Sequence, residues 1–254
     1  SRPAYSVIMP VDRKGNTLSD DELQKLSVLL KMPVADLKKK IEDNKRAFGA
    51  IYLANDVGVD VATQIEEKKD DFPGIQIEVN PLRVYPLGAA GAQVLGYVGE
   101  AGPDDKDADG NPYTTATLIG RAGIERKYNQ YLEGKNGSKT IEVNASGQPV
   151  GYVGGTPAVS GNNIRLTLDA NLQKAAEDAI DSQVKILAKS GIYATGASAV
   201  AIDPNSGAVL AMVSEPSYDP NRFSKGISTA DWNQIINNKN HPMQNRTIAS
   251  MYPP

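Results

Sequence analysis

The sequence predicts an α+β fold, because helices with recognisable caps are interspersed with short strands that pair locally. Three observations lead to this expectation. Ser19-Asp20-Asp21-Glu22 has the form of a helix capping box. Residues 75–79 alternate apolar and polar side chains, as a half-buried strand does. Residues 197–213 contain two β-rich runs around a Pro/Asn/Gly turn, which is typical of a hairpin.

The N-terminal part is expected to begin with a short strand over 4–9. Ser19 then serves as N-cap of a helix that reaches about Lys31, with Glu22 hydrogen-bonding back to the cap. Pro33 suits the first turn of a second helix through Ile41, because the missing N–H would have no helical partner there.

A third helix is expected to present the charge run 66–71 to solvent, and Phe72-Pro73-Gly74 ends it before the strand at 75–79. Residues 101–116 are acidic, contain Gly-Pro and Asn-Pro pairs, and form a loop. A helix from Ile124 to Leu132 follows.

Two strands, 138–144 and 150–153, precede a Gly/Pro/Ser-rich stretch at 154–161, which is the best candidate for a domain boundary. We therefore expect one domain over residues 1–160 and a second over residues 161–254.

The second domain is expected to open with a strand over 163–167. Asp169 then caps a long amphipathic helix to about Lys189. The hairpin 197–213 follows, with Pro204 fixing the turn and Gly207 free to take a positive φ. Loop and short helix around Trp232 complete the pattern.

Composition excludes several classes of function. The 254 residues are 40% hydrophobic and 22% charged, with a net charge of −3 and mixed signs, so nucleic acid is not an expected partner. No run approaches the ~18 apolar residues of a membrane span, and a membrane anchor would have to lie upstream. The chain has no cysteine and 1 histidine, which excludes disulfides, thiol nucleophiles and multi-histidine metal sites. We expect no cofactor and no metal.

Four short motifs resemble functional sites but have simpler interpretations. Ser182-Gln183-Val184-Lys185 matches Ser-x-x-Lys, yet it lies late in an amphipathic helix and no Gly or Pro elbow exposes its hydroxyl. Residues 105–110 resemble half of a calcium-binding loop, but the twelfth position is Ala116 instead of a carboxylate, which favours an acidic surface loop. Gly120-Arg121-Ala122-Gly123 resembles a nucleic-acid-binding Gly-x-x-Gly loop without basic neighbours. His241 is a loop histidine with no obvious carboxylate partner.

Several longer segments, taken in their order along the chain, are more informative than these short motifs. The first two are Arg83-Val84-Tyr85-Pro86 with Leu95-Gly96-Tyr97-Val98-Gly99-Glu100, and Gly120-Arg121-Ala122-Gly123-Ile124-Glu125 with Tyr128. Residues 163–172, 199–213 with 216–221, and 245–254 follow in the same order. Together they resemble class B penicillin-binding proteins, most closely the elongation type, penicillin-binding protein 2. The resemblance covers most of residues 75–254.

The resemblance implies an elongated N-terminal pedestal, or dimerisation-type, domain over 1–160. The first part of a transpeptidase domain, an antiparallel sheet with packed helices, would follow over 161–254. The pedestal motif would comprise nine residues: Arg83, Tyr85, Pro86, Gly96, Tyr97, Gly120, Gly123, Glu125 and Tyr128. Within it we expect Arg83 to pair with Glu125.

The activity implied is that of a bacterial peptidoglycan D,D-transpeptidase that acts on stem peptides, is acylated by β-lactams and uses no cofactor. It would be anchored by an upstream helix at the extracytoplasmic face of the cell membrane. The pedestal would bind the glycan polymerase and other elongation-complex proteins.

No catalytic residue is assigned in this chain, because Tyr252-Pro253-Pro254 resembles the lead-in to the family's Ser-x-x-Lys helix. The nucleophile is expected beyond Pro254, and the chain by itself is expected to be inactive. Two alternatives remain open: a non-catalytic module, either a wall-assembly scaffold or a β-lactam sensor, and a calcium-regulated adhesion module built on the acidic loop.

Overall fold

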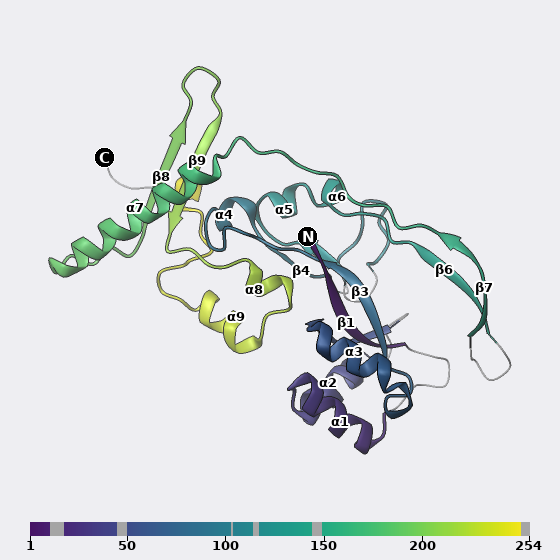
Figure 1. The fold of residues 1–254 in the computed structure, drawn as a ribbon. Coiled ribbons are helices and arrows are strands. Elements are labelled where there is room, and N and C mark those ends of the chain that lie inside the picture. Colours follow the sequence, from purple (N-terminus) through teal and green to yellow (C-terminus); the bar gives the residue numbers. More distant parts are fainter. Residues whose placement is uncertain (11–17, 45–49, 103, 114–116, 144–148, 250–254) are drawn as a thin grey trace. The chain divides into compact units, whose positions relative to one another are not determined.

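A computed structural model describes residues 1–10, 18–44, 50–102, 104–113, 117–143 and 149–249 (Figure 1). The helices are α1 Asp20–Leu30, α2 Val34–Asp43, α3 Val59–Glu67, α4 Ala92–Leu95, α5 Gly123–Lys127, α6 Asn129–Leu132, α7 Ala170–Lys189, α8 Asn221–Ser224, α9 Thr229–Ile236 and α10 Arg246–Ala249, with a 3-10 turn η1 at Lys69–Asp71. The strands are β1 Arg2–Pro10, β2 Ala50–Val57, β3 Gln76–Leu82, β4 Val98–Glu100, β5 Leu118–Gly120, β6 Ser138–Val143, β7 Pro149–Thr156, β8 Ala197–Ile202 and β9 Val209–Glu215.

The chain forms two compact units, and neither is continuous in sequence. The N-terminal unit comprises Ser1–Arg83, Glu100–Leu118 and Gly134–Ser160. The C-terminal unit comprises Val84–Gly99, Ile119–Glu133 and Gly161–Pro254. Two stretches that precede residue 160 therefore belong to the C-terminal unit.

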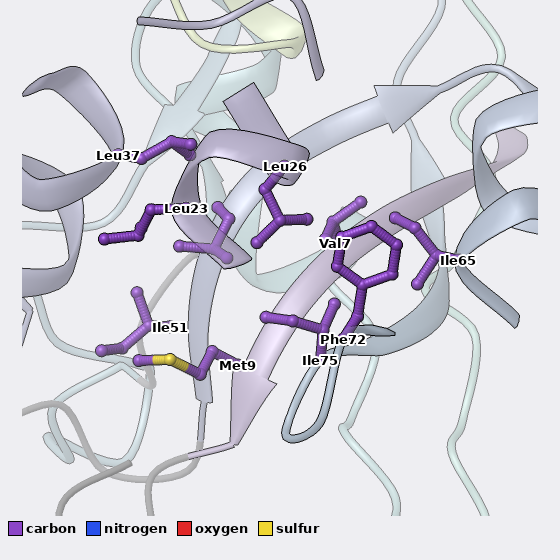
Figure 2. Close-up of a cluster of buried hydrophobic side chains, with 10 residues drawn as sticks. Val7, Met9, Leu23, Leu26, Leu37, Ile51, Ile65, Phe72 and Ile75 are labelled. Carbon is purple, nitrogen blue, oxygen red and sulfur yellow. The ribbon is translucent and has the colours of Figure 1, made fainter. Parts of the chain in front are cut away.

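The N-terminal unit is organised around an antiparallel sheet with strand order β2-β1-β3. In the register, Val7 of β1 lies opposite Ile77 of β3, and Ile8 lies opposite Tyr52 of β2. Figure 2 shows how side chains of α1, α2 and α3 meet the sheet in one apolar cluster. Its buried members are Val7, Met9, Leu23, Leu26, Leu37, Ile51, Leu53, Ile65, Phe72 and Ile75.

Local signals account for the helices of this unit. Both hydrogen bonds of the predicted capping box form, since Glu22 N donates to Ser19 Oγ and Ser19 N donates to Glu22 Oε2. α2 begins at Val34, with Pro33 in the N-cap position. β6 and β7 pair as the expected hairpin, but β7 extends to Thr156, which lies opposite Ser138. The first residues of the Gly-rich stretch thus belong to a strand.

The C-terminal unit contains α7, the β8–β9 hairpin and the helices that follow (Figure 1). Asp169 caps the 20-residue helix α7 as predicted, because its carboxylate accepts from the backbone N–H groups of Asn171 and Leu172. The predicted hairpin is also confirmed, with Gly207 at a φ of +73° in its turn.

Two predictions about this unit were wrong. Residues 163–167 form no strand. Thr167 Oγ1 donates to Val209 O at 2.7 Å, but no strand ladder forms over this stretch. The helix predicted over 124–132 is divided into α5 and α6 at Tyr128, whose φ of −114° departs from helical geometry.

Candidate functional site

The residues of the resembling motifs come together inside the C-terminal unit, where Val84–Gly99 and Ile119–Glu133 join the later part of the chain. We call Val84–Gly99 the arm.

Two glycines allow the arm and the segment Ile119–Glu133 to approach at backbone distance, and a third allows that segment to fold tightly on itself. A Cβ on Gly96, where φ is +80°, would lie 1.9 Å from Ala122 O. A Cβ on Gly123, where φ is +55°, would lie 2.5 Å from Val94 O of the arm. Within the segment Ile119–Glu133, a Cβ on Gly120 would lie 2.0 Å from Glu125 O. Because the obstructing atoms are backbone, no rotamer change can relieve these overlaps, and only glycine fits.

Tyr85 links this junction to the later part of the chain. Its buried hydroxyl donates to Glu125 Oε1 at 3.2 Å. Its backbone N–H donates to Asn221 Oδ1, and its carbonyl accepts from Asn221 Nδ2, both at 2.9 Å. The Asn221 side chain therefore pairs with the arm much as a neighbouring strand would.

An aromatic cluster lies beside this contact. Tyr97 stacks on Phe223 with ring centroids 4.0 Å apart, and Tyr218 meets both rings edge-on. Tyr218 also donates its hydroxyl to Ala92 O at 3.2 Å. Burial raises the pKa of the Tyr97 and Tyr218 hydroxyls, so both remain protonated at neutral pH and act as packing groups.

Helix α7 and strand β9 are joined to each other and to the arm by two side chains. Gln173 is 2% exposed and pairs with both backbone groups of Met212, at 2.8 and 3.0 Å. Its Nε2 also donates to Glu177 Oε1 at 2.7 Å. The same carboxylate oxygen accepts from Gly91 N of the arm at 2.7 Å.

Glu215, at the end of β9, is a half-buried carboxyl group whose pKa is raised. Burial raises the pKa of Glu215, and the nearby Glu177 carboxylate raises it further. The backbone N–H of Ser217 works in the opposite direction.

The other predicted motif residues lie at the margins of the junction. Pro86 and Tyr128 are exposed, and Tyr128 contacts the ring of Tyr131 at a centroid distance of 6.2 Å. Arg83 is partly buried. Its pairing with Glu125 stays a prediction.

The motif Ser182-x-x-Lys185 has a local structural role. Ser182 Oγ donates to Asp178 O at 2.7 Å, as helical serines often do, and Lys185 pairs with Asp181. Both groups thus bond to neighbours within α7 instead of to each other.

The acidic loop also uses its carboxylates internally. Asp107 Oδ1 accepts from the N–H groups of Asp109 and Asn111, and the Asn111 backbone is the main cause that lowers the pKa of Asp107. Ala116 and the terminal 250–254 lie outside the described residues. Among those that are described, no group of three or more His, Cys, Asp or Glu side chains could hold a metal ion.

No sequence pattern points to the roles of Asn221, Gln173 and Gln93, whose amides contact backbone more than 35 positions away. A single Gln or Asn carries no local signal of such a partner. Within the described ranges, no helix is both long and apolar enough to cross a bilayer.

Comparison with known proteins identifies the family. The model of the penicillin-binding protein dimerisation domain matches residues 1–166, and the model of the penicillin-binding protein transpeptidase domain matches residues 197–254.

Named relatives agree with these matches. The peptidoglycan D,D-transpeptidase MrdA of Salmonella typhimurium (strain LT2) is 34% identical over 226 residues, which are 87% of this chain and 34% of that protein. MrdA of Escherichia coli (strain K12) is 34% identical over 262 aligned positions, covering 100% of this chain and 39% of the relative. The chain thus spans little more than a third of these relatives.

A solved complex of penicillin-binding protein PBP2 with MreC from Helicobacter pylori matches 100% of this chain and 45% of that one, with a TM-score of 0.74 and 26% identity. A second PBP2 structure from the same organism has a TM-score of 0.70 and 25% identity. The resemblance expected from the motifs is therefore confirmed, and the chain belongs to the penicillin-binding protein family, with a dimerisation domain followed by the start of a transpeptidase domain.

Proposed function

We propose that the intact protein carrying this chain is a peptidoglycan D,D-transpeptidase that works by serine acyl transfer. The observation that carries the proposal is the order of the two family matches, dimerisation domain at 1–166 and transpeptidase domain at 197–254, in a chain whose relatives are named D,D-transpeptidases. A serine activated by a lysine one helical turn away would attack the D-Ala–D-Ala bond and release D-Ala. An amine on a neighbouring peptidoglycan strand would then take the acyl group.

In this proposal residues 1–254 supply the frame and no nucleophile. Residues 1–160 form the pedestal, and residues 161–254 form the front of the transpeptidase domain. The local pairing of Ser182 and Lys185 within α7 supports this division, since neither group is placed to activate the other. The motif glycines support it too, because their role is close backbone packing.

We propose that the pedestal binds glycan polymerase and other elongation-complex proteins, and that an upstream helix anchors the protein at the extracytoplasmic face of the membrane. The solved complex of a PBP2 with MreC supports binding to elongation-complex proteins by likeness. Stem peptides and β-lactams would bind the catalytic part.

Labelling with fluorescent penicillin tests the proposal. Residues 1–254 should remain unlabelled, and the chain expressed with its natural continuation should form a stable covalent adduct and release D-Ala from a D-Ala–D-Ala peptide. A Ser182→Ala variant of the longer protein should label like the wild type. An intact protein that binds β-lactam without peptide turnover would favour the sensor alternative, and one that does neither would favour the scaffold.

A further inference from the structure

The arm contributes one side chain, Gln93, that joins two separate parts of the later chain. Gln93 lies in α4 and is half-buried. Its Nε2 donates to Ser214 O at the end of β9, at 3.0 Å, and to Pro242 O in the loop before α10, at 2.9 Å. Pro216 O lies 3.4 Å away. A primary amide has two N–H groups, so these two short contacts use its full donor capacity.

Ser214 of β9 also contacts the loop before α10. It is 3% exposed, and its hydroxyl donates to Gln244 O at 2.9 Å. The hydroxyl oxygen also accepts from the backbone N–H of Arg246, at 3.0 Å, where α10 begins. Strand β9 and the arm thus hold this stretch together, one through a hydroxyl and the other through an amide.

Arg246 stiffens the stretch from within. Its side chain is buried, and its guanidinium donates to the carbonyls of His241 at 3.2 Å and Asn240 at 2.5 Å. Gly196 makes room for it, because a Cβ there would lie 2.2 Å from Arg246 Nε. The loop at 240–245 is therefore bonded to Arg246 at the start of α10, and the Pro242 carbonyl within this loop accepts from Gln93 of the arm.

We propose that Gln93 is a positioning residue: through Ser214 O and Pro242 O it fixes segment 240–249, and with it the chain leading toward the nucleophile, against strand β9. This inference rests on the proposed function, since it assumes that the reactive serine follows this segment. Gln93 itself touches no substrate in this scheme. It acts through backbone that it holds at two points.

Both contacts require a hydrogen-bond donor at the end of the residue 93 side chain, because both partners are carbonyl oxygens. Gln93→Glu keeps the shape of the side chain and replaces the N–H donors by oxygen, so two carbonyls would face a carboxylate. Gln93→Met removes the donors without adding charge. Gln234→Glu is the matched control, because Gln234 is an exposed glutamine of α9 in the same unit and carries the same charge change.

The test uses the intact protein and two readouts. Hydrogen–deuterium exchange should speed up in residues 240–249 of both Gln93 variants, and the Gln234→Glu variant should exchange like the wild type. In stopped-flow acylation by a chromogenic cephalosporin, the limiting acylation rate should fall by up to ~100-fold, the cost of displacing a reacting group by about 1 Å. The cephalosporin's dissociation constant before acylation should stay within about twofold.

Each outcome decides the matter. Wild-type exchange and a wild-type acylation rate in both Gln93 variants would overturn the inference, as would a change in ligand affinity with no change in the limiting rate. Failure of both variants to fold would make Gln93 a purely structural residue and overturn it too. If the wild-type protein is not acylated at all, the proposed function fails, and faster exchange in 240–249 still decides whether Gln93 holds this segment.

Discussion

Replacing Gly96 by alanine is the most direct test of the junction between the arm and the segment at 119–133. The φ of Gly96 is +80°, and an added Cβ would lie 1.9 Å from Ala122 O and 2.8 Å from Gly123 N. Both atoms are backbone, so the two segments would have to move apart. The substitution therefore imposes a conformational cost and a steric cost at the same position.

Gly226 provides a comparison that carries no steric cost. Its φ is +87°, close to that of Gly96, but nothing lies within 4 Å of the position a Cβ would take. Gly226→Ala should lose only the cost of a left-handed alanine, about 1–2 kcal/mol. Gly96 has φ +80° and ψ −158°, a region that essentially only glycine occupies, so alanine there costs about 1–3 kcal/mol in backbone strain. Gly96→Ala adds the strain of overpacking, about 1–3 kcal/mol, for a total of about 2–6 kcal/mol.

Trp232 provides the assay, because it is the only tryptophan in the sequence and it packs in the core of the C-terminal unit. Its ring lies edge-on to Phe223 at a centroid distance of 6.2 Å, so its emission reports unfolding of this unit. Each kcal/mol corresponds to about 2–4 °C in a domain of this size. We expect Gly96→Ala to melt measurably below Gly226→Ala. Equal losses in the two variants would refute the close-approach argument.

Three further predictions follow from single contacts. Glu215→Gln should raise stability at neutral pH: burial raises the folded pKa of Glu215, so its contribution is full below the unfolded pKa of ~4.3 and is lost as pH rises through the folded value. Trp232 melting curves should show the gain vanish near pH 4, and a pH-independent gain would contradict the stated cause. Ser19→Ala should cost about 1 kcal/mol by circular dichroism in urea, because it removes half of the capping box, and no loss would mean that α1 does not depend on its cap. Asn221→Asp should cost about 1–3 kcal/mol in the same titration, since Tyr85 O loses its donor; an unchanged midpoint would show that the Asn221 contact is dispensable.

The sequence predicted those elements whose signals are local. The Ser19 and Asp169 caps and the Gly207 turn each depend on residues within a few positions, and the structure places all three as expected. Strand β2 was missed although Ile51 and Leu53 alternate, because it follows a stretch with no clear turn signal. Residues 163–167 alternate as well but form no strand, because alternation does not show whether a partner strand is in reach.

The residues of the junction could be predicted from the sequence, but their structural role could not. Gly96 and Gly123 could be selected from the motif, but the sequence did not reveal that each leaves open the space occupied by the backbone of the other segment. The partners of Gln93, 121 and 149 positions away, had no sequence signal at all. Long-range hydrogen bonds to backbone depend only on the final fold, so they become visible only in a structure.

The discontinuous C-terminal unit leads to a last prediction about residues 161–254 expressed alone. Without the arm, Phe223 loses its stacking partner Tyr97, and the buried Tyr218 hydroxyl loses its acceptor at Ala92 O. The core cluster of this unit includes Ala92, so an apolar contact is lost as well. We expect the fragment to show the red-shifted emission of exposed Trp232, and the chain 1–254 to show blue-shifted emission. Native-like emission with a cooperative melt from 161–254 would mean that the arm is dispensable for folding. Residues 161–254 would then be an independent domain in spite of their contacts with the arm.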